Sequence, residues 1–361
     1  MSAPSPETRL VVLVTGSMRS GTSSLAGSLS LLGLHVPQPE VPAAPRNPKG
    51  HFESRWVIEF HKRHLLAARV RPSDSSPQAQ QRVDAVLADG WVADELAAWL
   101  AEQHEPRIVV KDPHAHWFLA TWQQVAGRTG RDLRLVTPLR HPAEVVGSQE
   151  RTWGHRRDDA MRLMKETSNV AGWLNVVLVT ERGGRGAPRA FSRYTDLLDD
   201  WRATLGRVCD QLDLDLPVPG VGVTHVLDEF LDTGLRTSRL SFDDIRVPAR
   251  LQTLAAEAWT ALETLVTAPD DAPALAVLDR VRADYDDLYA ESRAIALDDR
   301  HHAARVASQE KAARMRVRTR RLRARLEQRD AEIERLTRPV PETPAARARR
   351  LAGRVVRRVM R

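Results

Sequence analysis

The chain has 361 residues, of which 42% are hydrophobic and 28% charged, so a disordered or fibrous class is excluded and a globular one expected. A single cysteine, Cys209, excludes an intrachain disulfide. The apolar run Leu10–Val14 is too short for a signal peptide, and no run reaches the roughly 18 residues of a membrane-spanning helix. We therefore expect a cytoplasmic protein.

Charge is distributed unevenly along the chain. Residues 300–361 hold 20 Arg or Lys against 6 Asp or Glu, a net charge of +14, while the whole chain carries +7. The first 299 residues therefore carry −7, and this asymmetry predicts a separate partner for the basic end. We expect a catalytic domain at 1–299, a basic helix at 300–337, and a Pro-containing linker with a basic amphipathic tail at 338–361.

In chain order, predicted strands alternate with predicted helices. Apolar runs within 9–15 and 107–111 indicate buried parallel strands, and further strands are expected at 133–139 and 189–194. Helical segments are expected at 22–32, 56–70, 78–103, from the second strand to about 126, from 142, at 158–181 and at 196–212. This alternation predicts an α/β fold with a central parallel sheet and helices on both faces.

A glycine-rich turn lies between the first strand and its helix. Gly16 and Gly21 allow the backbone to curl so that N–H groups point at one anion, and the helix N-terminus adds partial positive charge. The spacing fits a P-loop-like nucleotide-binding fold. However, Thr22 stands where a nucleotide triphosphatase has lysine, and the cation of the turn is Arg19. A turn without a ligand remains the alternative.

Two later segments extend this pattern. Arg140 ends the third strand, and Ser148 follows eight residues on, a pair suited to clamp a phosphate. After the fourth strand the chain reads Arg-Tyr-Thr-Asp-Leu at 193–197. With the turn Arg19-Ser20-Gly21-Thr22, these motifs resemble the sulfotransferases that use 3′-phosphoadenosine 5′-phosphosulfate (PAPS), over about residues 9–212.

The resemblance implies PAPS as co-substrate, a sulfuryl transfer to a hydroxyl or amine, and no metal. It implies cofactor-binding roles for seven residues besides Arg19, namely Ser20, Gly21, Thr22, Ser23, Arg140, Ser148 and Tyr194. The late glycine-rich phosphate loop of the cytosolic small-molecule enzymes is not found. The chain is therefore more similar to the branch of tyrosylprotein and bacterial carbohydrate sulfotransferases, and a carbohydrate or glycolipid acceptor is preferred.

Six residues are candidates for the chemistry. Arg19 and Lys111 are the cations expected to stabilise charge on the leaving phosphate, although Lys111 also fits a surface salt bridge. Glu53 is the first candidate for the base, with capping of the following helix as its alternative role. His114 is the second candidate, and Asp112 and His51 are further rivals.

The basic end allows three interpretations. Met315, Leu322 and Leu336, with Leu326 and Ile333 on the alternate seam, form a short heptad pattern that Thr319 and Arg329 interrupt. A coiled coil between chains, a solvated helix, and attachment to an anionic membrane remain open, the last favoured by arginines beside Val355, Val356 and Val359. No nucleic-acid-binding module is recognised.

Two other functions remain open. A nucleotide or small-molecule kinase could use the same turn, although the missing lysine argues against it. A non-catalytic scaffold could act through the basic tail. The residues that line the acceptor-binding site are expected within 36–70, 158–181 and 220–250. None of these segments has a sequence pattern that identifies the acceptor.

Overall fold

The computed structural model describes residues 9–44, 47–153, 159–236, 238–338 and 343–359. The side chains of 150–153, 355, 356, 358 and 359 lie outside that description.

The described residues form one four-stranded sheet in the order β2-β1-β3-β4. The strands are β1 (Leu10–Val14), β2 (Arg107–Lys111), β3 (Asp132–Leu139) and β4 (Arg189–Arg193), and every neighbouring pair is parallel. The prediction of a parallel sheet is confirmed. Because parallel strands end at the same edge, the residues that follow them converge there.

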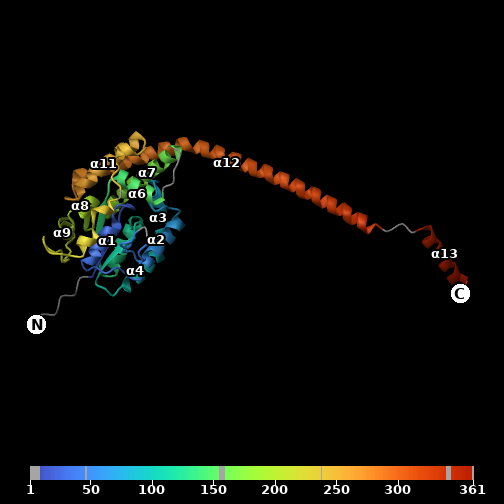
Figure 1. Cartoon of the computed structure of the whole chain (residues 1–361), viewed down its shortest axis with the longest axis horizontal. Helices are drawn as coiled ribbons and strands as arrows, with labels where there is room; N and C mark the ends of the chain where they lie inside the picture. Colours follow the sequence, from blue (N-terminus) through green and yellow to red (C-terminus); the bar gives the residue numbers. More distant parts are fainter. Residues whose placement is uncertain (1–8, 45–46, 154–158, 237, 339–342, 360–361) are drawn as a thin grey trace. The chain divides into compact units, whose positions relative to one another are not determined.

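Helices cover both faces of this sheet (Figure 1). On one face, side chains that include Val11 and Leu13 pack against α2 (Arg55–Ala68), α3 (Ala79–Leu87), α4 (Trp91–Ala101) and α5 (Leu119–Arg128). On the other, Val12 and Val14 pack against α1 (Thr22–Leu31), α8 (Tyr194–Asp199) and α9 (Trp201–Leu212). Burial on both faces explains why β1 and the middle of β2 are continuously apolar.

A third apolar cluster joins β3 and β4 to a further group of helices. The group comprises α6 (Pro142–Trp153), α7 (Asp159–Gly184), α11 (Ala249–Leu265) and the beginning of α12 (Ala272–Thr337). The short elements η1 (Ala115–Phe118), α10 (Leu227–Phe230), η2 (Thr233–Leu235) and η3 (Phe242–Asp244) lie in the connections.

Three helix predictions need correction. The helix expected over 196–212 is divided into α8 and α9 at Asp200, which caps the start of α9. The segment expected as one helix over 78–103 forms two, α3 and α4, because the chain turns at Asp89 and Gly90. The helix expected from Arg300 begins at Ala272, since Leu278, Val281 and Tyr285 lie at helical spacing on a buried face.

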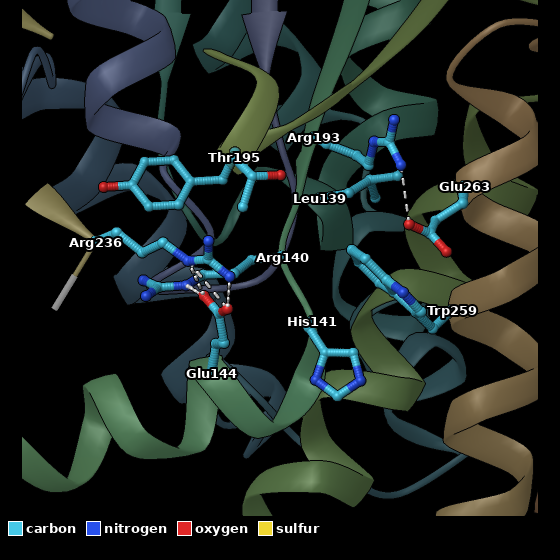
Figure 2. Close-up of a pocket in the computed structure, with 10 residues that line it drawn as sticks. Leu139, Arg140, His141, Glu144, Arg193, Thr195, Arg236, Trp259 and Glu263 are labelled. Carbon is cyan, nitrogen blue, oxygen red and sulfur yellow. Dashed lines mark hydrogen bonds and ion pairs between the residues drawn. The ribbon is translucent and has the colours of Figure 1, made fainter. Parts of the chain in front are cut away.

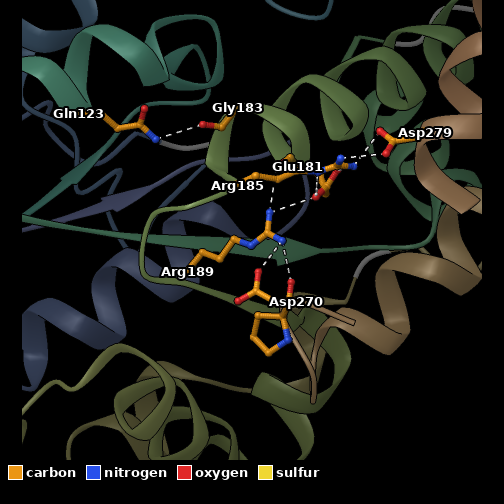
Figure 3. A network of polar contacts seen from close by, with 8 residues as sticks. Gln123, Glu181, Gly183, Arg185, Arg189, Asp270 and Asp279 are labelled. Carbon is orange, nitrogen blue, oxygen red and sulfur yellow. Dashed lines mark hydrogen bonds and ion pairs between the residues drawn. The ribbon is translucent and has the colours of Figure 1, made fainter. Parts of the chain in front are cut away.

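A polar network fixes β4 from its amino end (Figure 3). The buried guanidinium of Arg189 donates to Glu181 Oε1 at 3.0 Å and to Asp270 Oδ1 at 2.9 Å. Arg185 donates to both carboxylate oxygens of Asp279 at 2.9 Å each. Burying charges is tolerated only when they are paired, so the network ties β4 to α7 and to the start of α12. It thereby positions the residues that follow β4.

The chain divides into two units, Met1–Glu291 and Ser292–Arg361. In the second unit every described residue whose side chain is described is exposed. It contains the later part of α12 and α13 (Pro344–Val359). Five residues predicted to contribute to membrane attachment have side chains outside the described residues, namely Val355, Val356, Arg358, Val359 and Arg361. In the described parts of the chain, no helix is both long enough and apolar enough to cross a bilayer.

Candidate active site

The turn after β1 adopts the curled backbone that its glycines predict. Gly16 and Gly21 have φ angles of 115° and 92°, and Arg19 also lies in the left-handed region, at 67°. A non-glycine residue there costs roughly 1–2 kcal/mol, so the surrounding contacts must hold Arg19 in place. The hydroxyl of Ser20 is buried and has no hydrogen-bond partner among the described residues. An unpaired buried donor inside a curled turn fits an anion-binding loop.

Tyr194, at the end of β4, lies directly against this loop. A Cβ atom added to Gly21 would come within 2.2 Å of the Tyr194 ring, so only glycine fits at that position. The Tyr194 hydroxyl donates to the Leu235 carbonyl at 3.1 Å. Burial raises the pKa of Tyr194, which keeps its phenol neutral. The first and third sequence motifs therefore meet in space.

Arg19, Ser148 and Arg140 also converge. Arg19 Nε donates to Ser148 Oγ at 3.0 Å, and Arg140 Nη1 donates to the Arg19 carbonyl at 3.1 Å. Burial, followed by the charge of Arg140, lowers the pKa of Arg19, although arginine stays protonated at any working pH. The loop after β1 and the pair after β3 therefore build one cationic site.

Glu144 joins Arg140 to a further arginine (Figure 2). It accepts from Arg140 Nε at 3.0 Å and from Arg236 Nη2 at 2.5 Å. Arg140 Nη2 donates to the Ser238 carbonyl at 3.2 Å. Among the described residues, three of the five N–H donors of Arg140 are thus used, and the other two remain for a ligand.

A cavity of about 170 Å³ lies at the carboxyl ends of β3 and β4 (Figure 2). Arg140 and Arg236 line it on one side, and Trp259 and Glu263 of α11 line it on the other, while Tyr194 also belongs to its lining. Arg140 also lies over the Tyr194 ring, 5.0 Å from its centroid. Cationic and aromatic groups at the carboxyl edge of a parallel sheet are suited to bind a nucleotide. Sequence reasoning missed Glu144, Arg236 and Trp259.

Lys111, at the end of β2, forms a second polar cluster. Its ammonium donates to Ser23 Oγ at 3.0 Å and contacts Glu53 Oε1. Only 2% of the Lys111 side chain is exposed, so the pair is buried and differs from the surface salt bridge considered as an alternative. No capping hydrogen bond from Glu53 to α2 is found among the described residues. Asn47 donates to Ser23 Oγ at 3.3 Å and lies 3.5 Å from His51 Nδ1.

Asp112 holds two histidines beside this cluster. Its carboxylate contacts His114 Nδ1 at 2.5 Å and His61 Nδ1 at 2.7 Å. Trp122 Nε1 donates to His61 Nε2 at 3.1 Å, so His61 is neutral with its proton on Nδ1. Burial alone would raise the pKa of Asp112, but His114 and then His61 lower it well below its usual range. His114 Nε2 makes no hydrogen bond to any described residue, which leaves it open to a substrate proton.

The predicted site residues thus fall into two groups. The structure brings Arg19, Ser20, Gly21, Arg140, Ser148 and Tyr194 together at β1, β3 and β4. Ser23 links the loop to Lys111 and Glu53, while Thr22 is buried as the first residue of α1. In the described part of the chain, no three His, Cys, Asp or Glu residues are placed to hold a metal ion.

No protein-family model and no curated protein matches the chain. Three solved structures are similar to it in fold. The sulfotransferase domain of the Synechococcus PCC 7002 olefin synthase has a TM-score of 0.38 and 20% identity, covering 71% of this chain and 96% of that one. The sulfotransferase domain of the curacin biosynthetic pathway has a TM-score of 0.38 and 14% identity, covering 70% and 98%. The sulfotransferase STF1 of Mycobacterium tuberculosis H37Rv has a TM-score of 0.35 and 16% identity, covering 70% and 76%.

Proposed function

We propose that the chain is a sulfotransferase that moves a sulfuryl group from PAPS to a hydroxyl or amine. The observation that carries the proposal is the meeting of Arg19 with Ser148 and Arg140, which joins the loop after β1 to the pair after β3. A donor with phosphate at both its 5′ and 3′ ends needs cationic groups at two such places. A P-loop kinase would need a lysine at Thr22.

The residues present fit this donor. Ser20 Oγ offers an unused buried donor within the loop, and Gly21 leaves the backbone open to close approach. Arg140 keeps two donors for a 3′-phosphate, beside Ser148. The cavity between Tyr194 and Trp259 offers aromatic walls for a nucleoside. When bound, PAPS supplies an activated sulfuryl group on a phosphate leaving group.

Catalysis in this arrangement is mainly alignment and charge stabilisation. Arg19 stabilises the negative charge that develops on the 5′-phosphate, and it does so as a permanent cation, without giving up a proton. Lys111 is buried between Ser23 and Glu53, so its ammonium is held in one place. It stabilises charge at the transferred group and is paired with the neighbouring Glu53 carboxylate.

We propose that Glu53 accepts the proton of the acceptor. Glu53 reaches the phosphate loop through Lys111 and Ser23, whereas the contacts of His114 lead through Asp112 and His61 into the apolar core. His114 is the second candidate because Asp112 orients it and leaves Nε2 open. A carboxylate or an imidazole can each perform general-base catalysis within hydrogen-bond reach.

The acceptor class that we propose to test first is a carbohydrate or a glycolipid headgroup. Such molecules present several hydroxyls, and a hydroxyl requires the base that Glu53 offers. Incubation of labelled PAPS with cell extract, followed by mass spectrometry of the labelled products, would identify the acceptor.

Binding of nucleotides tests the proposal directly. We expect 3′,5′-ADP to raise the Tm of the full chain, and ATP with magnesium to leave it unchanged, because Arg140 and Ser148 recognise a 3′-phosphate. Protection by ATP alone would instead support a kinase. Protection by neither nucleotide would support a non-catalytic scaffold, which acts through the basic tail.

A further inference from the structure

The second part of α12 carries an apolar seam whose side chains are exposed, with none of the described residues covering them. We define the seam as Met315, Leu322, Leu326, Ile333 and Leu336, which recur at alternating spacings of three and four when Thr319 and Arg329 are included. Leu326 is 60% exposed and Leu336 is 71% exposed. A helix of this length with an exposed apolar seam, interrupted only at Thr319 and Arg329, is typical of a coiled-coil helix without its partner.

We propose that residues 312–336 pair with the same residues of a second copy of this chain, with the two helices antiparallel. The proposal is independent of the catalytic activity. The charges beside the seam determine the relative orientation of the two helices.

The antiparallel pairing closes the seam over its whole length. It places Leu322 opposite Leu326 of the second copy, Met315 opposite Ile333, and Ala312 opposite Leu336. Because the antiparallel pair is symmetric, each of these three contacts occurs twice in the dimer. The two interruptions also meet, because Thr319 lies opposite Arg329, so no arginine faces an arginine within the core.

The flanking charges support the same arrangement. In the antiparallel pair Arg318 lies beside Glu332 of the second copy, and Arg316 lies beside Asp330, each in both directions. Arg323 and Arg325 lie beside their own counterparts, close to the centre. Favourable pairs therefore outnumber unfavourable ones.

A parallel pair reverses this balance. It sets Arg329 against Arg329 in the core, Lys311 beside Arg316, and Arg318 beside Arg323. Only Arg325 finds an opposite charge, in Asp330. A like-charged pair in the core costs far more than an exposed pair contributes, so the parallel arrangement is disfavoured.

The apolar layers select the register. Shifting the antiparallel pair by one heptad toward the C-terminus would improve the charges, because Arg323 would meet Asp330 and Arg325 would meet Glu332. That shift, however, places Arg329 against Leu326 and leaves Leu322 with Ile333 as the fully apolar layer. Burial of a leucine layer outweighs an exposed ion pair by a few-fold, so the unshifted register is favoured.

Cysteine crosslinking of the full chain tests orientation. The native Cys209 is buried and its pKa is raised to about 11, so it does not react at neutral pH. Chains carrying Met315→Cys and Ile333→Cys are mixed and treated with a short bis-maleimide. Antiparallel pairing predicts the mixed product, and neither chain alone should crosslink. Crosslinking of Met315→Cys chains to each other would overturn the proposal, since the two antiparallel positions lie about 27 Å apart along the helix.

Charge reversal gives a second test, because it should change the dimer affinity in opposite directions for antiparallel and parallel pairing. Arg318→Glu places a new carboxylate beside Glu332 of the second copy in the antiparallel pair, and it should weaken the dimer about tenfold by sedimentation equilibrium. In a parallel pair the same change removes a repulsion from Arg323 and strengthens the dimer. The double variant Arg318→Glu with Glu332→Arg should restore wild-type affinity.

The wild-type chain provides the remaining control. We expect its mass to rise with concentration between about 1 and 100 µM, the affinity range of a short coiled coil. A chain that stays monomeric over this range overturns the proposal. If that monomer instead binds vesicles of anionic lipid, and Leu322→Asp abolishes the binding, the seam is a membrane contact.

Discussion

The two polar clusters at the edge of the sheet differ in charge balance. Beyond β1 and β3, Arg19, Arg140 and Arg236 face one carboxylate, Glu144, and the cluster keeps an excess of positive charge. Beyond β2, the ammonium of Lys111 is matched by Glu53, while Asp112 lies between two histidines. The first cluster is suited to hold an anion and the second to hold or move a proton. Separate changes in each cluster should therefore affect separate steps.

The largest effect is expected from the proposed base. Glu53→Gln keeps the shape of the side chain and can still accept from Lys111, but it removes the basicity. We expect kcat to fall by roughly 10²–10⁴-fold, with the Kd for 3′,5′-ADP within about threefold of wild type. His114→Asn, which keeps a donor toward Asp112, is the matched control and should be milder. The reverse order of these two effects would assign the base to His114.

Arg19, which lies in the cluster with Arg140 and Glu144, should also affect the chemical step. Arg19→Ala should lower kcat by about 10²-fold, the scale expected for loss of one transition-state donor, and Arg19→Lys should recover part of the loss. Arg128→Ala removes the same charge from an exposed residue that pairs with Asp94, and should stay within about threefold. Near-normal turnover of Arg19→Ala would leave Lys111 as the cation at the leaving group.

Nucleotide discrimination tests the cationic cluster without catalysis. Wild-type protein should bind 3′,5′-ADP at least about tenfold more tightly than 5′-AMP by calorimetry, because a charge-assisted contact is worth about 1.5–3 kcal/mol. Ser148→Ala should reduce this ratio about threefold or more. Ser28→Ala, whose hydroxyl bonds only the Ser24 carbonyl within α1, should not change it. Equal affinity of wild-type protein for the two nucleotides would contradict the role of Arg140 and Ser148.

A separate effect concerns acid stability, and it comes from buried histidines on the β2 side of the sheet. Burial lowers the pKa of His61 and lowers that of His116 to about 3, and the Nε2 of His116 finds no acceptor among the described residues. The unfolded chain binds more protons than the native one below pH 6.5, so stability is lost as the pH falls. Each neutral histidine contributes up to about 1.4 kcal/mol per pH unit to that loss.

Urea unfolding measures this slope. The lowered pKa of Asp112 affects stability only near and below the ordinary value of 3.8 for that group. Between pH 6.5 and about 4, the pH dependence of the free energy of unfolding therefore arises from the histidines. His116→Gln should make the slope shallower there. An identical slope for wild type and variant would show that His116 is not the group responsible.

Local patterns made much of the fold and part of the site predictable. β1 and β2 follow from continuous apolar runs, and the curled turn follows from Gly16 and Gly21. Arg140 and Ser148 could be paired from sequence because a strand end and the next helix fix their distance, and the structure places both beside Arg19. These predictions required only short-range geometry.

Other parts of the site depend on contacts between distant segments. Arg236 lies in a connection without regular spacing, and nothing in its neighbours indicates that it meets Glu144, 92 residues earlier. The contact of His61 with Asp112 depends on how α2 packs across the sheet. The single helix predicted over 78–103 was wrong because a glycine within a helical pattern is often tolerated, whereas Gly90 here lies between two helices.

The contact between Gly21 and Tyr194 has an evolutionary consequence. Any side chain at position 21 would overlap the aromatic ring at position 194, with a first carbon 2.2 Å from it. Neither position can therefore drift alone, although 173 residues separate them in the chain. Among descendants of a common ancestor, we expect glycine at the first position wherever the second is aromatic. A larger residue at the first should accompany a small one at the second.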